Sequence, residues 1–138
     1  MTTQPPVITP PPVTTPPRRM PVVTTAGRAL QVIRASYGAA LILAPGPVLR
    51  LATGRPPSRR ACRTARLLGA RHLVQTALTA AAPWPGTFAI GGQVDTLHAA
   101  SMVLLAAVSR SGRRPALTDA LTEAAFAAAG FSASIQPW

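Results

Sequence analysis

Acidic residues are almost absent from this 138-residue chain, which has three of them against fourteen arginines and no lysine. The formal net charge is +11, yet charged residues make up only 12% of the chain and apolar residues 48%. All three acids, Asp95, Asp119 and Glu123, lie inside apolar, alanine-rich stretches. Carboxylates normally cover the outside of a soluble protein, so this placement predicts paired charges inside a membrane helix bundle.

Signatures of catalysis are also lacking. The single cysteine, Cys62, excludes an internal disulfide and leaves the redox compartment open. The chain has no G-x-S-x-G, H-E-x-x-H or C-x-x-C motif, and its Ser and Thr residues have no nearby base. We therefore expect a protein that is not an enzyme and that holds no cofactor.

Proline, by contrast, is abundant and concentrated near the N-terminus. Residues 1–25 hold eight of the sixteen prolines and seven threonines, with Arg18 and Arg19 as their only charges. Such a composition cannot build a core and samples polyproline II, so it predicts a disordered Pro/Thr-rich arm. A basic region followed by an apolar one is missing, so we do not expect a signal peptide. Residues 26–138 are then a helical membrane domain.

Four apolar segments follow the arm, at about 29–49, 67–82, 87–108 and 115–135. Each is close to the roughly 20 residues that cross a hydrocarbon core of about 30 Å. The sequence therefore predicts an all-α fold, a bundle of four transmembrane helices. The second segment is short and the fourth is mostly alanine, so both need partners from the same bundle.

Charge in the connections predicts the orientation of this bundle. Residues 50–66 and 109–114 are rich in arginine, whereas 83–86 and 132–138 carry no charge. The positive-inside rule places the two Arg-rich loops in the cytoplasm and both termini outside the cell membrane. Nine arginines in these loops outnumber the three that precede the first segment.

Residue counts along the segments predict which charges meet. Arg34 and Asp95 fall at a similar depth in the outer half and form a candidate ion pair. Arg71, in the inner half, can meet Asp119 and also Glu123, one turn further along the same face. An unpaired charge at mid-bilayer costs about 2.5–3.5 kcal/mol on insertion scales, so pairing is expected. The simplest interpretation is that these pairs hold the bundle in register.

The third segment carries a polar face. Asp95, His98 and Met102 are spaced i, i+3 and i+7, and a carboxylate and an imidazole at that spacing could shuttle a proton or share a metal. The simpler interpretation is that His98 hydrogen-bonds to a neighbouring helix. His72 falls near the opposite, cytoplasmic end of the adjacent segment, so no metal site is predicted.

The Arg-rich loop is a candidate contact for membrane lipids. Arginine near an anionic membrane surface contributes about 1 kcal/mol per residue. The candidate head-group contacts are Arg55, Arg59, Arg60 and Arg63. Cys62 lies among them, where the positive field favours its thiolate, but an incidental loop cysteine is the simpler interpretation.

Two stretches carry a resemblance to a known group of proteins. Leu67-Leu-Gly-Ala-Arg-His-Leu-Val-Gln75 is followed, after a Pro/Gly break, by Val94-Asp-Thr-Leu-His-Ala-Ala-Ser-Met102 and an alanine-rich last helix. This pattern resembles small uncharacterised four-helix integral membrane proteins of actinobacteria, in which a Gly-x-Arg motif opens one helix and an Asp lies in the next. The resemblance covers about residues 28–131. It implies an integral membrane protein and brings no catalytic residues.

Three classes of function remain open. The first is an integral membrane protein that serves as a small accessory or scaffold subunit of a cell-envelope complex, with membrane lipids, a larger membrane complex or further copies of itself as partners. The second is a small proton-coupled transporter in which Arg34, Asp95 and His98 line a polar path. The third is a soluble basic helical protein that binds nucleic acid through residues 50–66. The apolar runs disfavour nucleic acid as a partner.

Overall fold

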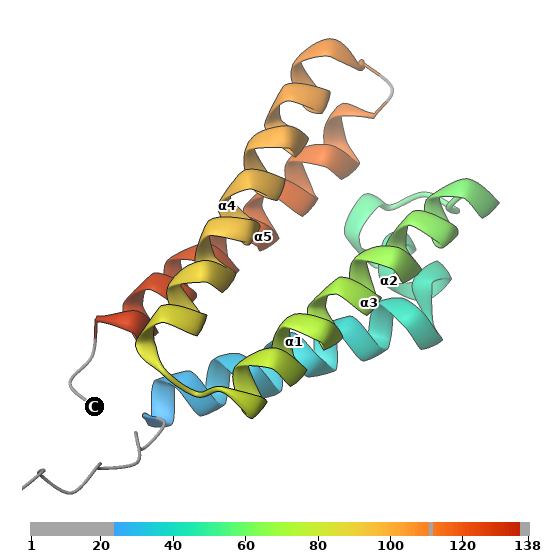
Figure 1. Cartoon of the computed structure of the whole chain (residues 1–138). Helices are drawn as coiled ribbons and strands as arrows, with labels where there is room; N and C mark the ends of the chain where they lie inside the picture. Colours follow the sequence, from blue (N-terminus) through green and yellow to red (C-terminus); the bar gives the residue numbers. More distant parts are fainter. Residues whose placement is uncertain (1–23, 111, 136–138) are drawn as a thin grey trace, which may run out of the picture.

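Helices account for the architecture of the chain. The computed structural model describes residues 24–110 and 112–135, and these form five α-helices and no strand (Figure 1). The all-α prediction is therefore confirmed for this part of the chain. In chain order the helices are α1 (Thr25–Leu43), α2 (Pro45–Thr53), α3 (Arg59–Ala81), α4 (Pro85–Val108) and α5 (Arg113–Ser134). Residues 1–23 of the predicted arm lie outside the described residues, while Thr24 and Thr25 open α1.

The stretch 50–66 was predicted as a connection, and this is wrong for most of its length. Residues 50–53 belong to α2, and 59–66 form the first two turns of α3. Ser58 explains the early start of α3, because its hydroxyl accepts a hydrogen bond from the backbone N–H of Ala61 at 3.1 Å and so caps the helix. Arginine is also a good helix former, so a polar run of this kind need not be a loop.

The first predicted segment, 29–49, is two helices rather than one. α1 ends at Leu43, Ala44 leaves the helical conformation, and Pro45 occupies the first turn of α2. Proline is favoured there because its missing N–H would have no partner in the helix. Helix resumes after one residue, with the axis turned by 106°. The described chain thus has five helices where four were predicted.

The four long helices are arranged as two antiparallel pairs, α1 with α3 and α4 with α5 (Figure 1). Gly38 and Gly69 allow the first pair to approach closely: a Cβ at Gly69 would lie 2.5 Å from the carbonyl oxygen of Gly38, and one at Gly38 would lie 2.9 Å from that of Gly69. At one end of the molecule α2 passes into α3 and α4 into α5. We call this the arginine-rich end, and its arginines are Arg50, Arg55, Arg59, Arg60, Arg63, Arg66, Arg110, Arg113 and Arg114.

Apolar side chains are distributed in an unusual way. The core is small, with one cluster of Leu30, Phe88, Phe126 and Ala133. Large apolar side chains are exposed on all four long helices. Examples are Val32, Ile33, Val74, Leu78, Leu97, Leu104, Leu121 and Phe131.

Only one described helix is both long and apolar enough to cross a membrane. This is α4, in which the best 18-residue window has a mean hydropathy of 1.2 and is 22% buried. Together, α1 and α2 also pass the same test, as a pair broken by the 106° bend. Neither α3 nor α5 passes it alone, so the finer prediction of four transmembrane helices is not established by length and composition.

Candidate functional site

Charged and polar side chains from all four long helices meet inside the bundle. Each comes from near the middle of its helix: Arg34 from α1, Arg71 and His72 from α3, Asp95 from α4 and Glu123 from α5. Asp95, His72 and Glu123 are 0% exposed and Arg34 is 3% exposed. Burying ionised groups is costly unless they are paired and hydrogen-bonded, so the contacts within this group decide whether the fold tolerates it. We call these five residues the ionic cluster.

Asp95 is the most highly coordinated member of the ionic cluster. Arg34 donates through Nη2 to its Oδ2. Its Oδ1 accepts from Nη2 of Arg71 at 2.7 Å and from Nε2 of Gln75 at 3.1 Å. Three donors from α1 and α3 therefore compensate one buried carboxylate on α4, and the carboxylate ties the two helix pairs together.

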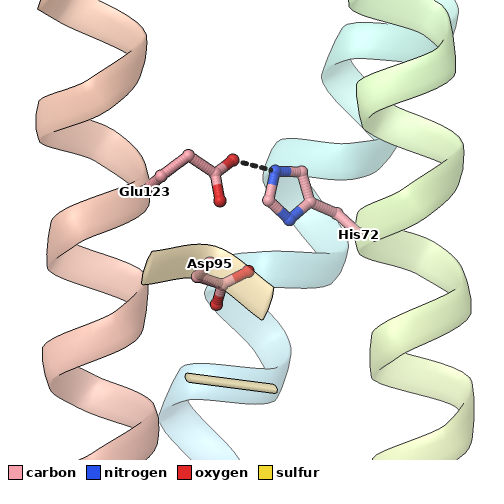
Figure 2. A group of neighbouring side chains, drawn as sticks. All are labelled: His72, Asp95 and Glu123. Carbon is pink, nitrogen blue, oxygen red and sulfur yellow. Dashed lines mark ion pairs between the residues drawn. The ribbon is translucent and has the colours of Figure 1, made fainter. Parts of the chain in front are cut away.

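Glu123 forms the second centre of the ionic cluster. Its Oε2 accepts from Nη2 of Arg71, which thus contacts both carboxylates. Its Oε1 lies 2.9 Å from Nε2 of His72 (Figure 2). This distance is within ion-pair range, and the contact is an ion pair when His72 is protonated. Figure 2 also shows Asp95 reaching into the same space from a third helix.

Aromatic rings and a glycine complete the surroundings. The rings of His72, Tyr37 and Phe126 pack against one another, with the His72 centroid 5.4 Å from Tyr37 and 5.2 Å from Phe126, and with Tyr37 and Phe126 5.8 Å apart. The guanidinium carbon of Arg34 lies 5.1 Å from the centroid of the Phe126 ring, a cation–π contact. Gly91 leaves room for the same guanidinium, because a Cβ there would lie 3.3 Å from its Nη1. The ionic cluster is therefore held in place by the packing of aromatic rings as well as by its ion pairs.

His98 and Asp119 form a second polar pair, between α4 and α5. Nε2 of His98 lies 2.8 Å from Oδ2 of Asp119, and the two side chains are 25% and 21% exposed. The pair adjoins the ionic cluster, since ligand atoms of His98, Asp119 and Glu123 all lie within 4.8 Å of one another. Polar groups therefore continue from the partly exposed His98 to the buried Glu123.

A metal ion does not suit this arrangement, although His72, Asp95 and Glu123 also offer three ligand atoms within 4.8 Å of one another. Guanidinium groups already occupy both carboxylates: Arg34 and Arg71 contact Asp95, and Arg71 contacts Glu123. A divalent cation would have to displace one positive charge and lie beside another. The residues fit an ion-pair network better than a metal centre.

The predicted pairs are confirmed in part. Arg34 does pair with Asp95, and Arg71 does pair with Glu123. The pairing of Arg71 with Asp119 is wrong, because Asp119 pairs with His98 instead. The separation into outer and inner layers is also wrong, since Arg71 joins Asp95 and Glu123 in one cluster.

His72 and Gln75 were missed as members of the site. His72 had been placed near a helix end because the second segment was taken to begin at 67. With α3 beginning at Arg59, His72 lies near the middle of the helix. One signal was present in the sequence, since Gln75 stands one helical turn after Arg71 and thus on the same face.

The candidate lipid contacts fall in two places at the arginine-rich end. Arg55 lines a cavity there, together with residues from the start of α5. Arg59, Arg60 and Arg63 lie in the first two turns of α3 with exposed side chains and do not line that cavity.

Comparison with protein-family models, with curated proteins and with solved structures finds no match to the chain. The resemblance to small actinobacterial membrane proteins therefore stays a prediction, and the function must be argued from the structure.

Proposed function

We propose that the chain is an integral membrane protein in which α1, α3, α4 and α5 form a transmembrane bundle. The observation that carries this proposal is the inverted distribution of polarity. Asp95, Glu123 and His72 are fully buried, while large apolar side chains are exposed on all four long helices. A soluble protein of this size would bury those apolar groups and expose the acids. In lipid the arrangement is the expected one, because ionisable residues then face the bundle interior and pair with one another.

α4 supports the same proposal. Its 24 residues extend about 36 Å at 1.5 Å per residue, enough to cross a hydrocarbon core of about 30 Å. Only 22% of its most apolar window is buried. The core helix of a soluble protein would be mostly buried. The exposed apolar surface of α4 therefore favours a location in which lipid surrounds the helix.

α3 and α5 are less apolar than α4 because they begin with arginines and also carry Arg71, His72 and Glu123 of the ionic cluster. Within the bundle their charges are compensated by partners on other helices, which lowers the cost of placing them in the membrane. The arginine-rich end then lies in the cytoplasm, following the positive-inside rule. The opposite end, where α3 passes into α4, lies outside.

The role that this arrangement supports best is a non-enzymatic accessory or scaffold subunit of a cell-envelope complex. The polar groups are used to join the two helix pairs, and the apolar outer faces remain available to lipids, to other membrane helices or to a second copy of the chain. Such contacts in lipid depend on close packing rather than on a hydrophobic drive.

A carbonate wash of membranes tests the proposed location. We expect the full chain to remain in the membrane pellet, whereas a peripheral protein is released. Recovery in the supernatant would refute the transmembrane bundle and would favour the soluble, basic alternative. The scaffold role is tested next by light scattering in mild detergent, where we expect a homo-oligomer or co-purifying subunits. A chain that remains a lone monomer contradicts that role.

A second candidate, a small proton-coupled transporter, is favoured by the series of ionisable groups that leads inward. His98 contacts Asp119, Asp119 adjoins Glu123, and Glu123 contacts His72. Proton relays in membrane proteins use such chains of carboxylates and imidazoles.

Two variants separate the candidates. Asp119→Asn removes an ionisable group from the series at a partly exposed position, so a carrier would lose proton flux in proteoliposomes while protein abundance stays unchanged. Asp95→Asn alters the centre of the ionic cluster. Lost abundance of this variant supports the scaffold, whereas normal abundance with lost flux supports the carrier.

A further inference from the structure

A cavity of about 620 Å³ lies at the arginine-rich end, away from the ionic cluster. It is formed by the end of α2, the α2–α3 connection, the start of α3 and the region where α4 passes into α5. Four arginines line it, from two separate parts of the chain: Arg55, and then Arg110, Arg113 and Arg114. Its volume is within the range of about 300–1,000 Å³ that is typical of ligand pockets.

These four guanidinium groups have no counter-charge within the described chain. Asp95, Asp119 and Glu123 are the only acidic residues in the sequence, and all three are engaged by partners in the bundle interior. None of them lines the cavity. Within residues 24–110 and 112–135 no ion pair involves any of the four arginines. Like charges gathered around one concavity repel one another, and an anion placed among them relieves that repulsion.

The start of α5 adds further donors on the same side. Its N-cap, Gly112, has no side chain to cap the helix, and the next residues, Arg113 and Arg114, line the cavity. Free N–H groups and the positive end of the helix dipole favour an anion at such a position. Ser58, the N-cap residue of α3, lines the cavity as well.

We infer that this cavity binds a phosphate group. Arginine presents planar, forked donors that match phosphate oxygens, and here four arginines line one cavity beside a helix N-terminus. The rest of the lining includes Leu49, Pro56 and Pro115, which provide an apolar wall beside the charged one. If the proposed membrane location holds, the phosphate is that of an anionic lipid head group at the cytoplasmic surface. The phosphate chemistry itself does not rest on that location, because a soluble phosphate compound would meet the same donors.

Two triple variants with the same change of charge test the inference. The first, Arg110→Gln/Arg113→Gln/Arg114→Gln, removes three arginines from the cavity. The matched control, Arg59→Gln/Arg60→Gln/Arg63→Gln, removes three exposed arginines from the same end that do not line it. All six side chains are exposed, so both variants keep the packed interior, which circular dichroism in detergent verifies.

Native mass spectrometry of the detergent-purified full chain, titrated with phosphatidylglycerol or phosphatidylcholine, gives the lipid readout. We expect bound phosphatidylglycerol to exceed phosphatidylcholine, and the cavity variant to lose affinity for it by roughly fivefold for each arginine removed. The control triple should stay close to the parent. An equal loss in both triples would show only a diffuse positive surface and would overturn the inference.

Calorimetry of the delipidated protein with inorganic pyrophosphate provides the second arm. Binding that depends on the cavity arginines, without any preference for phosphatidylglycerol, identifies a soluble source and upholds the phosphate site. Absence of cavity-dependent binding in both arms overturns it. Membrane partitioning of the cavity variant is measured in parallel, so failure of the site is distinguished from failure of the proposed location.

Discussion

Arg34 on α1 and Asp95 on α4 form an ion pair in which the two side chains are only 4% and 0% exposed. The pair links the two antiparallel helix pairs across 61 positions of sequence. Arg71 extends the link, because it contacts Asp95 and Glu123 together. Arg34 contacts one buried carboxylate and Arg71 contacts two, so the stability of the bundle should depend more on Arg71 than on Arg34.

We predict that Arg71→Ala destabilises the protein more than Arg34→Ala. Without Arg71, Glu123 retains only the contact with His72, and Asp95 also loses a donor. Without Arg34, Asp95 keeps Arg71 and Gln75. Removing one partner of a buried pair costs about 3–5 kcal/mol, so Arg71→Ala should reach or exceed that range. Thermal and denaturant unfolding in detergent measure the difference.

The control for this prediction is Arg63→Ala, because Arg63 is exposed and makes no ion pair in the described part of the chain. Surface substitutions of this kind usually change stability by less than about 0.5 kcal/mol. A loss for Arg63→Ala as large as that for Arg71→Ala would mean that the ionic cluster does not hold the bundle together.

A second prediction concerns the contact between α1 and α3. Gly69→Ala places a Cβ 2.5 Å from the carbonyl oxygen of Gly38 and 2.9 Å from the Cβ of Leu41, so the helices must separate. Overpacking of this kind typically costs about 1–3 kcal/mol.

Gly46→Ala in α2 is the matched control, since a Cβ there meets nothing within 4 Å. Gly46→Ala should cost less than Gly69→Ala, because no neighbouring helix has to move. Equal unfolding temperatures for the two variants would contradict the close approach.

The sequence alone predicted the helical class and the ion pair between Arg34 and Asp95. The reason is that a charge in the interior of the bundle needs a partner of opposite charge. With three acids in the chain and Arg34 inside an apolar segment, few partners were possible, and Arg34 does meet Asp95. Depth along the helices was less predictable, because it depends on where each helix begins. Moving the start of α3 from 67 to Arg59 brings Arg71 to mid-helix and merges two predicted layers into one cluster.

Side-chain direction was the other quantity that spacing could not supply. Asp119 and Glu123 are one turn apart on the same face of α5, and both were assigned to Arg71. The guanidinium reaches Glu123, while Asp119 meets His98 on α4. The spacing of residues in the sequence shows which side chains share a helix face. It does not show which basic side chain of a neighbouring helix lies next to each acid. The cavity at the arginine-rich end was hidden for the same reason, since it gathers Arg55 and Arg113 from distant parts of the sequence.

A third prediction is that insertion of α5 depends on α4. As an isolated segment α4 should insert efficiently into microsomal membranes in a glycosylation-mapping assay, given its mean hydropathy of 1.2. α5 alone should not, because it carries two acids, Asp119 and Glu123, and fails the hydropathy test that α4 passes despite Asp95; each central acid costs about 2.5–3.5 kcal/mol on insertion scales. In the α4–α5 hairpin, the contact between His98 and Asp119 offsets part of that cost. Insertion of α5 should therefore rise in the hairpin and fall again with His98→Ala. Equally efficient insertion of isolated α5 would refute this dependence.

The fourth prediction concerns orientation, and the single native cysteine provides the probe. Cys62 is partly exposed in the first turn of α3, at the arginine-rich end. If that end is cytoplasmic, as the positive-inside rule requires, a membrane-impermeant maleimide added to intact cells should not label Cys62 and should label it after lysis.

The matched variant is Trp84→Cys in a Cys62→Ala background, because Trp84 lies between α3 and α4 at the opposite end and is 53% exposed. It should be labelled in intact cells. The reverse pattern would mean that the bundle lies inverted in the membrane, and labelling of both positions in intact cells would mean that the four long helices do not span it.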